Sequence, residues 1–145
     1  MTKEVIGVEA LKKKLDGIKE ELHPKLVAQS VRASMVPMMK QARQNAPQGK
    51  DVHRTYKGRL VAPGFLKRNI KLRKMKFKDK TKVGYSLAAR KEAFYGKIIE
   101  QGFRDVSAKP WLGEAYNSTK SQVESNFRRA LLKRIEKGKR KGQGK

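Results

Sequence analysis

The chain of 145 residues contains no cysteine, only two histidines and 13 acidic residues. The absence of cysteine excludes a disulfide framework, a thiolate nucleophile and a cysteine-ligated zinc or iron–sulfur centre. Two histidines supply too few ligands for a transition-metal site, so we expect no metal. No run of about 18 apolar residues occurs, and residues 1–7 lack the apolar stretch of a signal peptide. We therefore expect a soluble cytoplasmic product with no membrane partner.

The motifs of common catalytic sites are also missing. There is no glycine loop ending in Lys-Ser or Lys-Thr, no His-Glu-x-x-His and no Gly-x-Ser-x-Gly. The acidic residues are scattered, whereas carboxylate catalysis needs two acids held together with shifted pKa values. We interpret His23 as structural, His53 as a solvated surface residue that could touch phosphate, and Glu100 as the acceptor of an ion pair or a backbone hydrogen bond. The protein is therefore predicted not to be an enzyme, with no catalytic residue and no cofactor.

Positive charge dominates the composition, because 37 Lys and Arg residues give a net charge of +24. The excess is concentrated in two blocks, +13 over residues 50–91 and +8 over residues 128–145. Residues 1–49 sum to +4, and residues 92–127 sum to −1. This asymmetry indicates nucleic acid or another anionic surface as a partner. The near-neutral block is typical of a packing or protein-contact region.

Two helices and a loop are expected before the first strand. Residues 8–22 carry apolar side chains at alternating steps of three and four, as in an amphipathic helix. Pro24 can open a second helix that stops near Pro47, and Pro37 inside it should kink or split it. The expected apolar side of this helix comprises Val27, Val31, Met35, Met38 or Met39, and Ala42. Residues 47–64 are rich in glycine and proline, with basic residues between them, and are expected to form a loop.

A β-hairpin is expected after this loop. Apolar and polar residues alternate over 69–77 and again over 82–87, with a turn at 78–81 between them. A change of parity between Leu72 and Met75 suggests a bulge or a strong bend. One face would pack on helices. The other would present to solvent Lys71, Arg73, Lys74, Lys76, Lys78, Lys80 and Lys82. The apolar face of the second strand comprises Val83, Tyr85 and Leu87.

Two further helices and a tail complete the expected domain. Residues 93–102 are too apolar for a loop and are expected to be helical, with the final glycine as a left-handed stop. Pro110 starts a last helix that ends at Gly138. Its inward side comprises Leu112, Ala115, Tyr116, Thr119, Val123, Phe127, Leu131 and Ile135. Residues 139–145 are expected to be a disordered basic tail. We predict one α+β domain over residues 1–138, in which N-terminal and long C-terminal helices pack a small antiparallel β-sheet.

Basic residues along a strand face and a flexible loop can follow a phosphate backbone, because charge neutralisation releases counterions and gives affinity without sequence preference. An excess of +13 over residues 50–91 is larger than solubility alone requires. No helix-turn-helix or zinc finger is visible, so base-specific contact is not expected. The residues predicted to face double-stranded DNA are Lys50, Arg54, Lys57, Arg59, Lys67, Arg68, Lys71, Arg73, Lys74, Lys76, Lys78, Lys80 and Lys82.

Four short motifs occur in a characteristic order. They are Ala46-Pro47; Gly64-Phe65-Leu66 with Asn69-Ile70; Tyr95-Gly96-Lys97-Ile98-Ile99-Glu100-Gln101-Gly102; and Pro110-Trp111-Leu112 with Ala115. Over about residues 7–135 this order resembles the tail-completion or head–tail joining proteins of tailed bacteriophages, which include the minor tail protein Z-like group. The chain departs from that family in its lengthened loop, residues 48–63, and in Phe103, where the family often has Thr.

The resemblance implies a structural virion protein of the tail or neck. Such a protein forms a homo-oligomeric ring at the top of the tail, next to the tail terminator, the tube and the head connector, around the passage of the genome. A lumen lined with Lys and Arg could hold the DNA end through many weak contacts. The predicted core and subunit-contact residues are Phe94, Tyr95, Ile98, Ile99, Glu100, Phe103, Trp111 and Leu112, with Trp111 expected in the core. The rival hypothesis is a sequence-nonspecific nucleic-acid-binding protein outside any virion, associated with the ribosome or the nucleoid.

Overall fold

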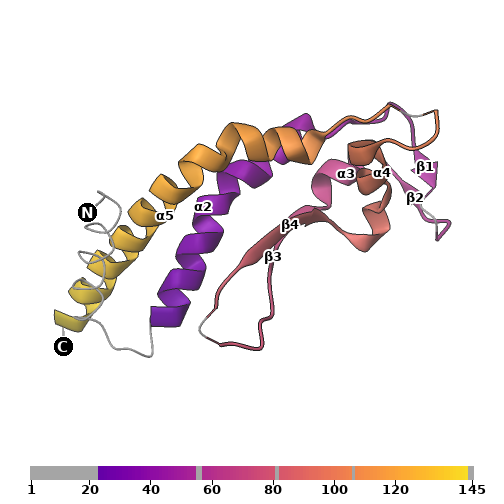
Figure 1. Cartoon of the computed structure of the whole chain (residues 1–145). Coiled ribbons are helices and arrows are strands. Elements are labelled where there is room, and N and C mark those ends of the chain that lie inside the picture. The colour runs from indigo at the N-terminus through magenta and orange to yellow at the C-terminus, as the bar shows by residue number, and fades with distance from the viewer. Residues whose placement is uncertain (1–22, 55–56, 81, 106, 144–145) are drawn as a thin grey trace.

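Two long helices form the body of the molecule (Figure 1). The computed structural model describes residues 23–54, 57–80, 82–105 and 107–143, so the helix expected over 8–22 lies outside the described residues. Helix α2 (His23–Asn45) and helix α5 (Trp111–Gln143) lie side by side and run in opposite directions (Figure 1). The Asn45 side chain at the end of α2 donates a hydrogen bond to the Trp111 carbonyl at the start of α5, with 3.4 Å between the atoms. This bond joins the two helices at one end of the pair.

Helix α2 buries small residues rather than the expected apolar stripe. Its buried residues are Ala28, Ser30, Ser34, Met38 and Ala42, whereas Val27, Val31 and Met35 are only half-buried. The two serines can be buried because each hydroxyl donates to a carbonyl of its own helix, Ser30 to Leu26 at 2.7 Å and Ser34 to Val31 at 2.6 Å. Helix α2 is not split at Pro37, since tertiary packing maintains the helix across the missing N–H donor.

Helix α5 is longer than the sequence indicated. It does not end at Gly138 but continues to Gln143, into the segment that was expected to be a disordered tail. On its inward side Ala115, Thr119, Leu131 and Ile135 are buried as predicted. Tyr116 is 53% exposed, so its inward assignment is wrong.

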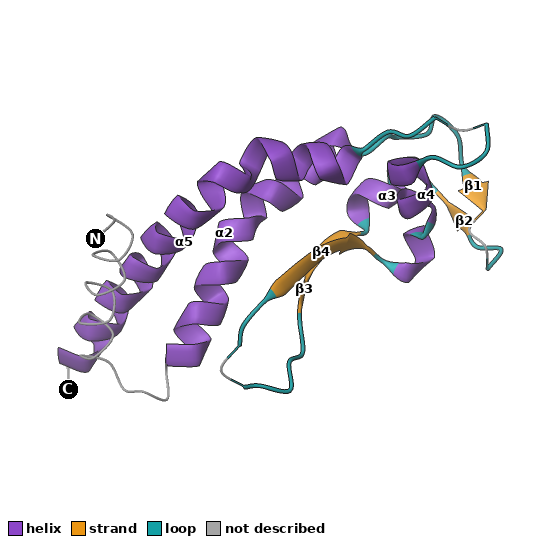
Figure 2. Ribbon diagram, viewed as in Figure 1, coloured by secondary structure: helices purple, strands orange, loops and turns teal. Residues whose placement is uncertain are grey.

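In the described residues, the β structure consists of two separate antiparallel pairs (Figure 2). Strands β3 (Ile70–Lys74) and β4 (Tyr85–Ala89) form the expected hairpin, with Ile70 opposite Ala89 and Lys74 opposite Tyr85. The second strand is therefore shifted relative to the expected 82–87. Strands β1 (His53–Arg54) and β2 (Leu60–Val61) form a second, shorter hairpin. It lies inside the segment 47–64 that was predicted to be a loop throughout.

The core lies where the C-terminal end of α2, the start of α5 and the hairpin base meet. Leu66, Ile70, Ala93 and Trp111 are buried there with the alanines of both long helices. Leu66 belongs to α3 (Phe65–Arg68), a short helix that the sequence analysis missed, and Ala93 ends the single turn η2 (Lys91–Ala93). The α+β class predicted from the sequence is confirmed.

Helix α4 (Tyr95–Gln101) confirms the helix expected over 93–102. Gly102 follows it with φ of 77°, a backbone conformation that glycine adopts without strain. The Trp111 indole lies against this helix and donates a hydrogen bond to the Gly96 carbonyl at 2.9 Å. With 3% of its surface exposed, Trp111 is a core residue, as expected.

Candidate nucleic-acid interface

The β3–β4 hairpin presents cations on one face. Lys71 and Arg73 alternate with Ile70 and Leu72, and both basic residues are exposed. Their cross-strand neighbours are the small residues Ala88 and Ser86, and neither strand contains an acidic residue. No side chain of the opposite strand therefore covers or neutralises these two cations.

Lys74 lies on the other face of the ladder. It has the same parity as Ile70 and Leu72 and pairs with half-buried Tyr85, so its assignment to the Lys71 face is wrong. Lys74 is exposed all the same, because burial decreases along β3 from Ile70 outward. Its ammonium group is available to an anion at the outer end of the hairpin.

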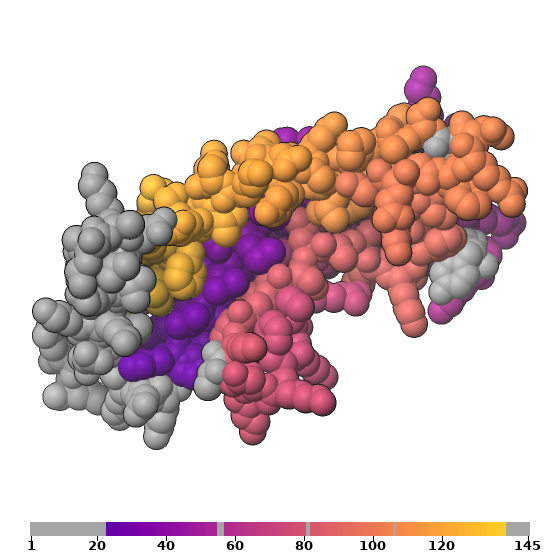
Figure 3. All heavy atoms as spheres, viewed as in Figure 1, coloured from indigo at the N-terminus to yellow at the C-terminus, as the bar shows by residue number. Residues whose placement is uncertain are grey.

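The segment between the two strands forms a basic and partly apolar tip. Lys76, Lys78, Lys80 and Lys82 are all exposed in this tip, together with Asp79. Met75 and Phe77 are 45% and 39% exposed, and both side chains approach Gly84. The Met75 N–H donates to the Gly84 carbonyl at 2.9 Å, so backbone pairing extends beyond the strand. In the space-filling view the hairpin forms a lobe that stands out beside α2 (Figure 3).

A second cluster of cations lies at the base of the hairpin. Arg43, Lys67, Arg68 and Lys71 line an open hollow of about 380 Å³. Arg43 comes from the last turn of α2, Lys67 and Arg68 from α3, and Lys71 from β3. Arg43 was not among the predicted residues, because nothing in its local sequence pattern shows that the end of α2 contacts the start of β3.

The remaining predicted cations lie at the other end of the molecule. Lys50, Arg54, Lys57 and Arg59 belong to the β1–β2 hairpin and its flanks, and all are exposed. Helices α3 and α4 separate this hairpin from the β3–β4 tip (Figure 1). Arg54 donates to the Gly58 carbonyl at 3.2 Å within its own turn. The residues predicted to face DNA therefore lie on two hairpins, with Lys67 and Arg68 of α3 between them.

His53 is not the solvated residue that the sequence indicated. Its ring packs edge-on against Tyr95 and Phe65, with centroid distances of 5.4 and 6.5 Å. The Nε2 atom is buried without a hydrogen-bond partner. Burial raises the pKa of the neighbouring Tyr95 hydroxyl, and this effect is partly offset by a backbone hydrogen bond at Leu66 and by the charge of Arg68. His53 therefore anchors the β1–β2 hairpin on α4 rather than facing solvent.

The near-neutral segment contains both interior and exposed residues. Glu100 accepts backbone hydrogen bonds from Leu112 at 2.7 Å and Gly113 at 2.8 Å, which confirms its predicted role as a backbone acceptor. Phe94, Ile98 and Phe103 are 46%, 38% and 56% exposed. We call these three residues the apolar patch. Tyr95, Ile99 and Leu112 are half-buried against the core.

Further cations line a groove between α2 and α5. This groove has a volume of about 780 Å³ and is lined by both apolar and basic residues. Its basic residues, which were not predicted as a site, are Lys25, Arg32, Lys133, Arg134 and Lys137.

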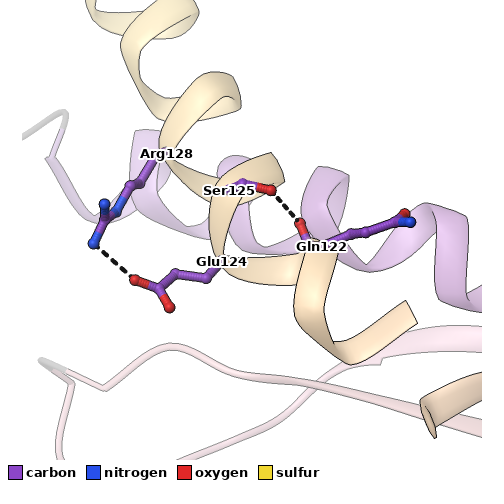
Figure 4. Close-up of polar contacts among 4 residues, drawn as sticks. All are labelled: Gln122, Glu124, Ser125 and Arg128. Atoms are coloured by element: carbon purple, nitrogen blue, oxygen red, sulfur yellow. Dashed lines mark hydrogen bonds and ion pairs between the residues drawn. The ribbon is translucent and has the colours of Figure 1, made fainter. Parts of the chain in front are cut away.

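Outside this groove, one cation of α5 is neutralised by a carboxylate of the same helix. Arg128 forms an ion pair with Glu124 at 2.7 Å, and the Ser125 hydroxyl beside it donates a hydrogen bond to the Gln122 carbonyl (Figure 4).

The described residues hold no group of three or more His, Asp or Glu side chains placed to bind a metal ion. None of the helices in the same residues has the length and apolarity needed to cross a lipid bilayer. Comparisons with models of known protein families, with curated proteins and with solved structures give no match.

Proposed function

We propose that this protein is a structural subunit of a tailed-bacteriophage virion, of the tail-completion or head–tail joining type. It would assemble as a ring at the top of the tail, next to the terminator, the tube and the head connector. The basic β3–β4 hairpin would face the DNA passage. The proposal rests on the order of the four sequence motifs and on the separation of cationic and apolar surfaces in the fold.

The observation that carries the proposal is the exposed cationic face of strands β3 and β4. Strands β3 and β4 contain no carboxylate, and Lys71 and Arg73 stand exposed over small neighbours. Cations on such a face neutralise phosphates and release counterions without reading base sequence. A ring repeats each surface patch around its axis. Repeated hairpins would therefore form a collar of weak, exchangeable contacts along a duplex.

The apolar patch supports self-association. Phe94, Ile98 and Phe103 expose large hydrophobic side chains on and beside α4, away from the hairpin tip. Covering such exposed apolar side chains with another subunit is favourable, because it removes apolar surface from water. Subunit contact through the patch would leave the cationic hairpin open to DNA. A free nucleic-acid-binding monomer, the rival function, has no need for such a patch.

Charge reversal at the hairpin tip tests the DNA contact. Replacing Lys74, Lys76, Lys78 and Lys80 with glutamate should abolish salt-sensitive retention of double-stranded DNA. Each phosphate contact contributes about 0.9 to the slope of log affinity against log salt, so the loss of four contacts should reduce the slope by about 3.6. The matched control reverses four exposed cations outside both hairpins: Lys40, Lys109, Lys120 and Arg129. Equal losses in both variants would mean that only net charge matters and would contradict the proposal.

The virion assignment is tested by electron microscopy of particles made without this product. Unjoined heads and tails are the expected result, and reintroducing the wild-type chain should restore joining. Normal particles together with intact DNA retention by the isolated chain would contradict the virion role and support the rival nucleic-acid-binding function.

A further inference from the structure

We infer that the hollow at the base of the β3–β4 hairpin is a phosphate-binding site whose ligand is a backbone phosphodiester of nucleic acid. The site is formed by Arg43, Lys67, Arg68 and Lys71. This inference deepens the proposed function and rests on it for the source of the phosphate. It adds a fixed anchoring point to the exposed cations of the hairpin, and it includes Arg43, which lies outside the basic block of the sequence.

The two arginines are held in place by backbone carbonyls. Arg43 Nε and Nη2 donate to the Ile70 carbonyl at 3.1 and 2.8 Å. Arg68 Nη1 and Nη2 donate to the carbonyls of Pro63 at 2.9 Å and Ala62 at 3.3 Å. These bonds use only part of the N–H donors of each guanidinium. The remaining donors are oriented in advance, which reduces the entropy that an anion must overcome on binding.

The charge of the site is uncompensated. All four residues that line the hollow are cationic, and none of them forms an ion pair with a carboxylate of the described ranges. Like charges at such short range repel each other. A dianion or a phosphodiester would relieve this repulsion and accept charge-assisted hydrogen bonds, which are stronger than neutral ones.

The size and position of the hollow favour a phosphodiester. At about 380 Å³ it has the volume of roughly 13 waters at about 30 Å³ each, so a phosphate fits with its flanking atoms. Lys71 belongs both to the hollow and to the exposed face of β3, where Arg73 follows on the same side. A polyanion bound in the hollow can therefore continue along the hairpin, whereas a single free phosphate uses only the base.

The test uses the full-length chain and a base variant in which Lys67 and Lys71 become glutamine. Neither lysine side chain forms a hydrogen bond with another residue of the described ranges, so the arginine contacts and the core remain. Inorganic phosphate is titrated into the isotope-labelled chain, and backbone amide shifts are followed by nuclear magnetic resonance. We expect shifts at the four lining residues, and at least tenfold weaker phosphate binding in the base variant. The matched control changes Lys74 and Lys76 to glutamine and should bind phosphate within twofold of the wild type.

A short DNA duplex distinguishes the two sources of phosphate. If the ligand is a phosphodiester, the base variant weakens duplex binding about tenfold and inorganic phosphate competes with the duplex. Loss of phosphate binding without any loss of duplex binding would overturn the nucleic-acid assignment. Equal phosphate affinity in the base variant and the control would overturn the site itself. Normal duplex binding by the base variant, with loss in the hairpin-tip variant, refutes this inference and leaves the proposed function intact.

Discussion

Glu100 stabilises the junction between α4 and α5, and replacing it with glutamine should measurably destabilise the protein. Its two carboxylate oxygens accept the Leu112 and Gly113 N–H groups at 2.7 and 2.8 Å. These N–H groups belong to the first turn of α5, where no carbonyl of the same helix can accept them. The same helix end carries the positive end of the helix dipole, which a carboxylate stabilises. One side chain therefore supplies two hydrogen bonds and a favourable charge.

The expected loss of stability depends on which of these interactions glutamine retains. Its amide oxygen can keep one of the two bonds, but its NH₂ group cannot accept the other. A hydrogen bond to a charged group contributes about 1.5–3 kcal/mol, and a charge at a helix end about 0.3–1 kcal/mol. Because Glu100 is half-exposed, water replaces part of the lost bond. We expect the free energy of unfolding to fall by about 2 kcal/mol, and the Tm to fall by about 5 °C for a chain of this size.

Trp111 provides the assay, because it is the only tryptophan and lies next to Leu112. Urea unfolding followed by tryptophan fluorescence should give a lower midpoint for Glu100→Gln, while the slope of unfolding free energy against urea concentration stays unchanged. The matched control is Glu124→Gln, which removes the same charge from an exposed pair with Arg128 (Figure 4). Exposed pairs contribute about 0.2–1 kcal/mol. If both variants lose the same stability, the cap contributes nothing beyond net charge, and this interpretation of Glu100 is wrong.

Two further variants test the packing around α4. Gly96→Ala places a Cβ 2.6 Å from the buried Leu66 Cδ1. The resulting overpacking should lower the free energy of unfolding by about 1–3 kcal/mol, which exceeds the gain in helix propensity. The control Gly49→Ala meets no atom within 4 Å and should leave the stability unchanged in the same urea unfolding. Since burial raises the pKa of Tyr95, the folded state retains the phenol proton more strongly than the unfolded state. The stability due to Tyr95 is therefore complete below pH 10 and is lost as the pH rises above it. Tyr95→Phe should remove a step above pH 10 from an absorbance titration and reduce the loss of stability there, and unchanged curves would refute this.

The elements predicted correctly are those whose apolar residues repeat with a clear period. Alternation around Ile70 and Leu72 located the hairpin, and the apolar run before Gly102 located α4. Hydrophobic periodicity did not predict the buried residues where small side chains form the packing contact. Helix α2 buries Ser30 and Ser34, which no hydrophobicity pattern would place inside, because their hydroxyls are satisfied by carbonyls of the same helix.

Short elements were missed for a different reason. Strands β1 and β2 contain two residues each, too few to show alternation. Their position depends on His53, whose ring packs on Tyr95 and Phe65 from distant parts of the sequence. Contacts of this kind arise only once the chain has folded.

The candidate site was predicted in composition but not in geometry. Charge counting found the basic block, yet it could not show that helices α3 and α4 separate the two hairpins (Figure 1). It also could not find Arg43, which joins Lys67, Arg68 and Lys71 only through the contact between α2 and β3. Net charge is a property of the sequence, whereas convergence of charges is a property of the fold.

The high positive charge of each subunit opposes assembly of the proposed ring. Each subunit has a net charge of +24, so bringing subunits together is opposed by repulsion. Phe94, Ile98 and Phe103 offer apolar contact, but three partly exposed side chains form a small interface compared with those of stable oligomers. DNA or an acidic partner in the lumen would supply the missing attraction. Assembly and polyanion binding should then be coupled, so that the ring forms on the tail or on DNA at concentrations where the isolated subunit remains a monomer.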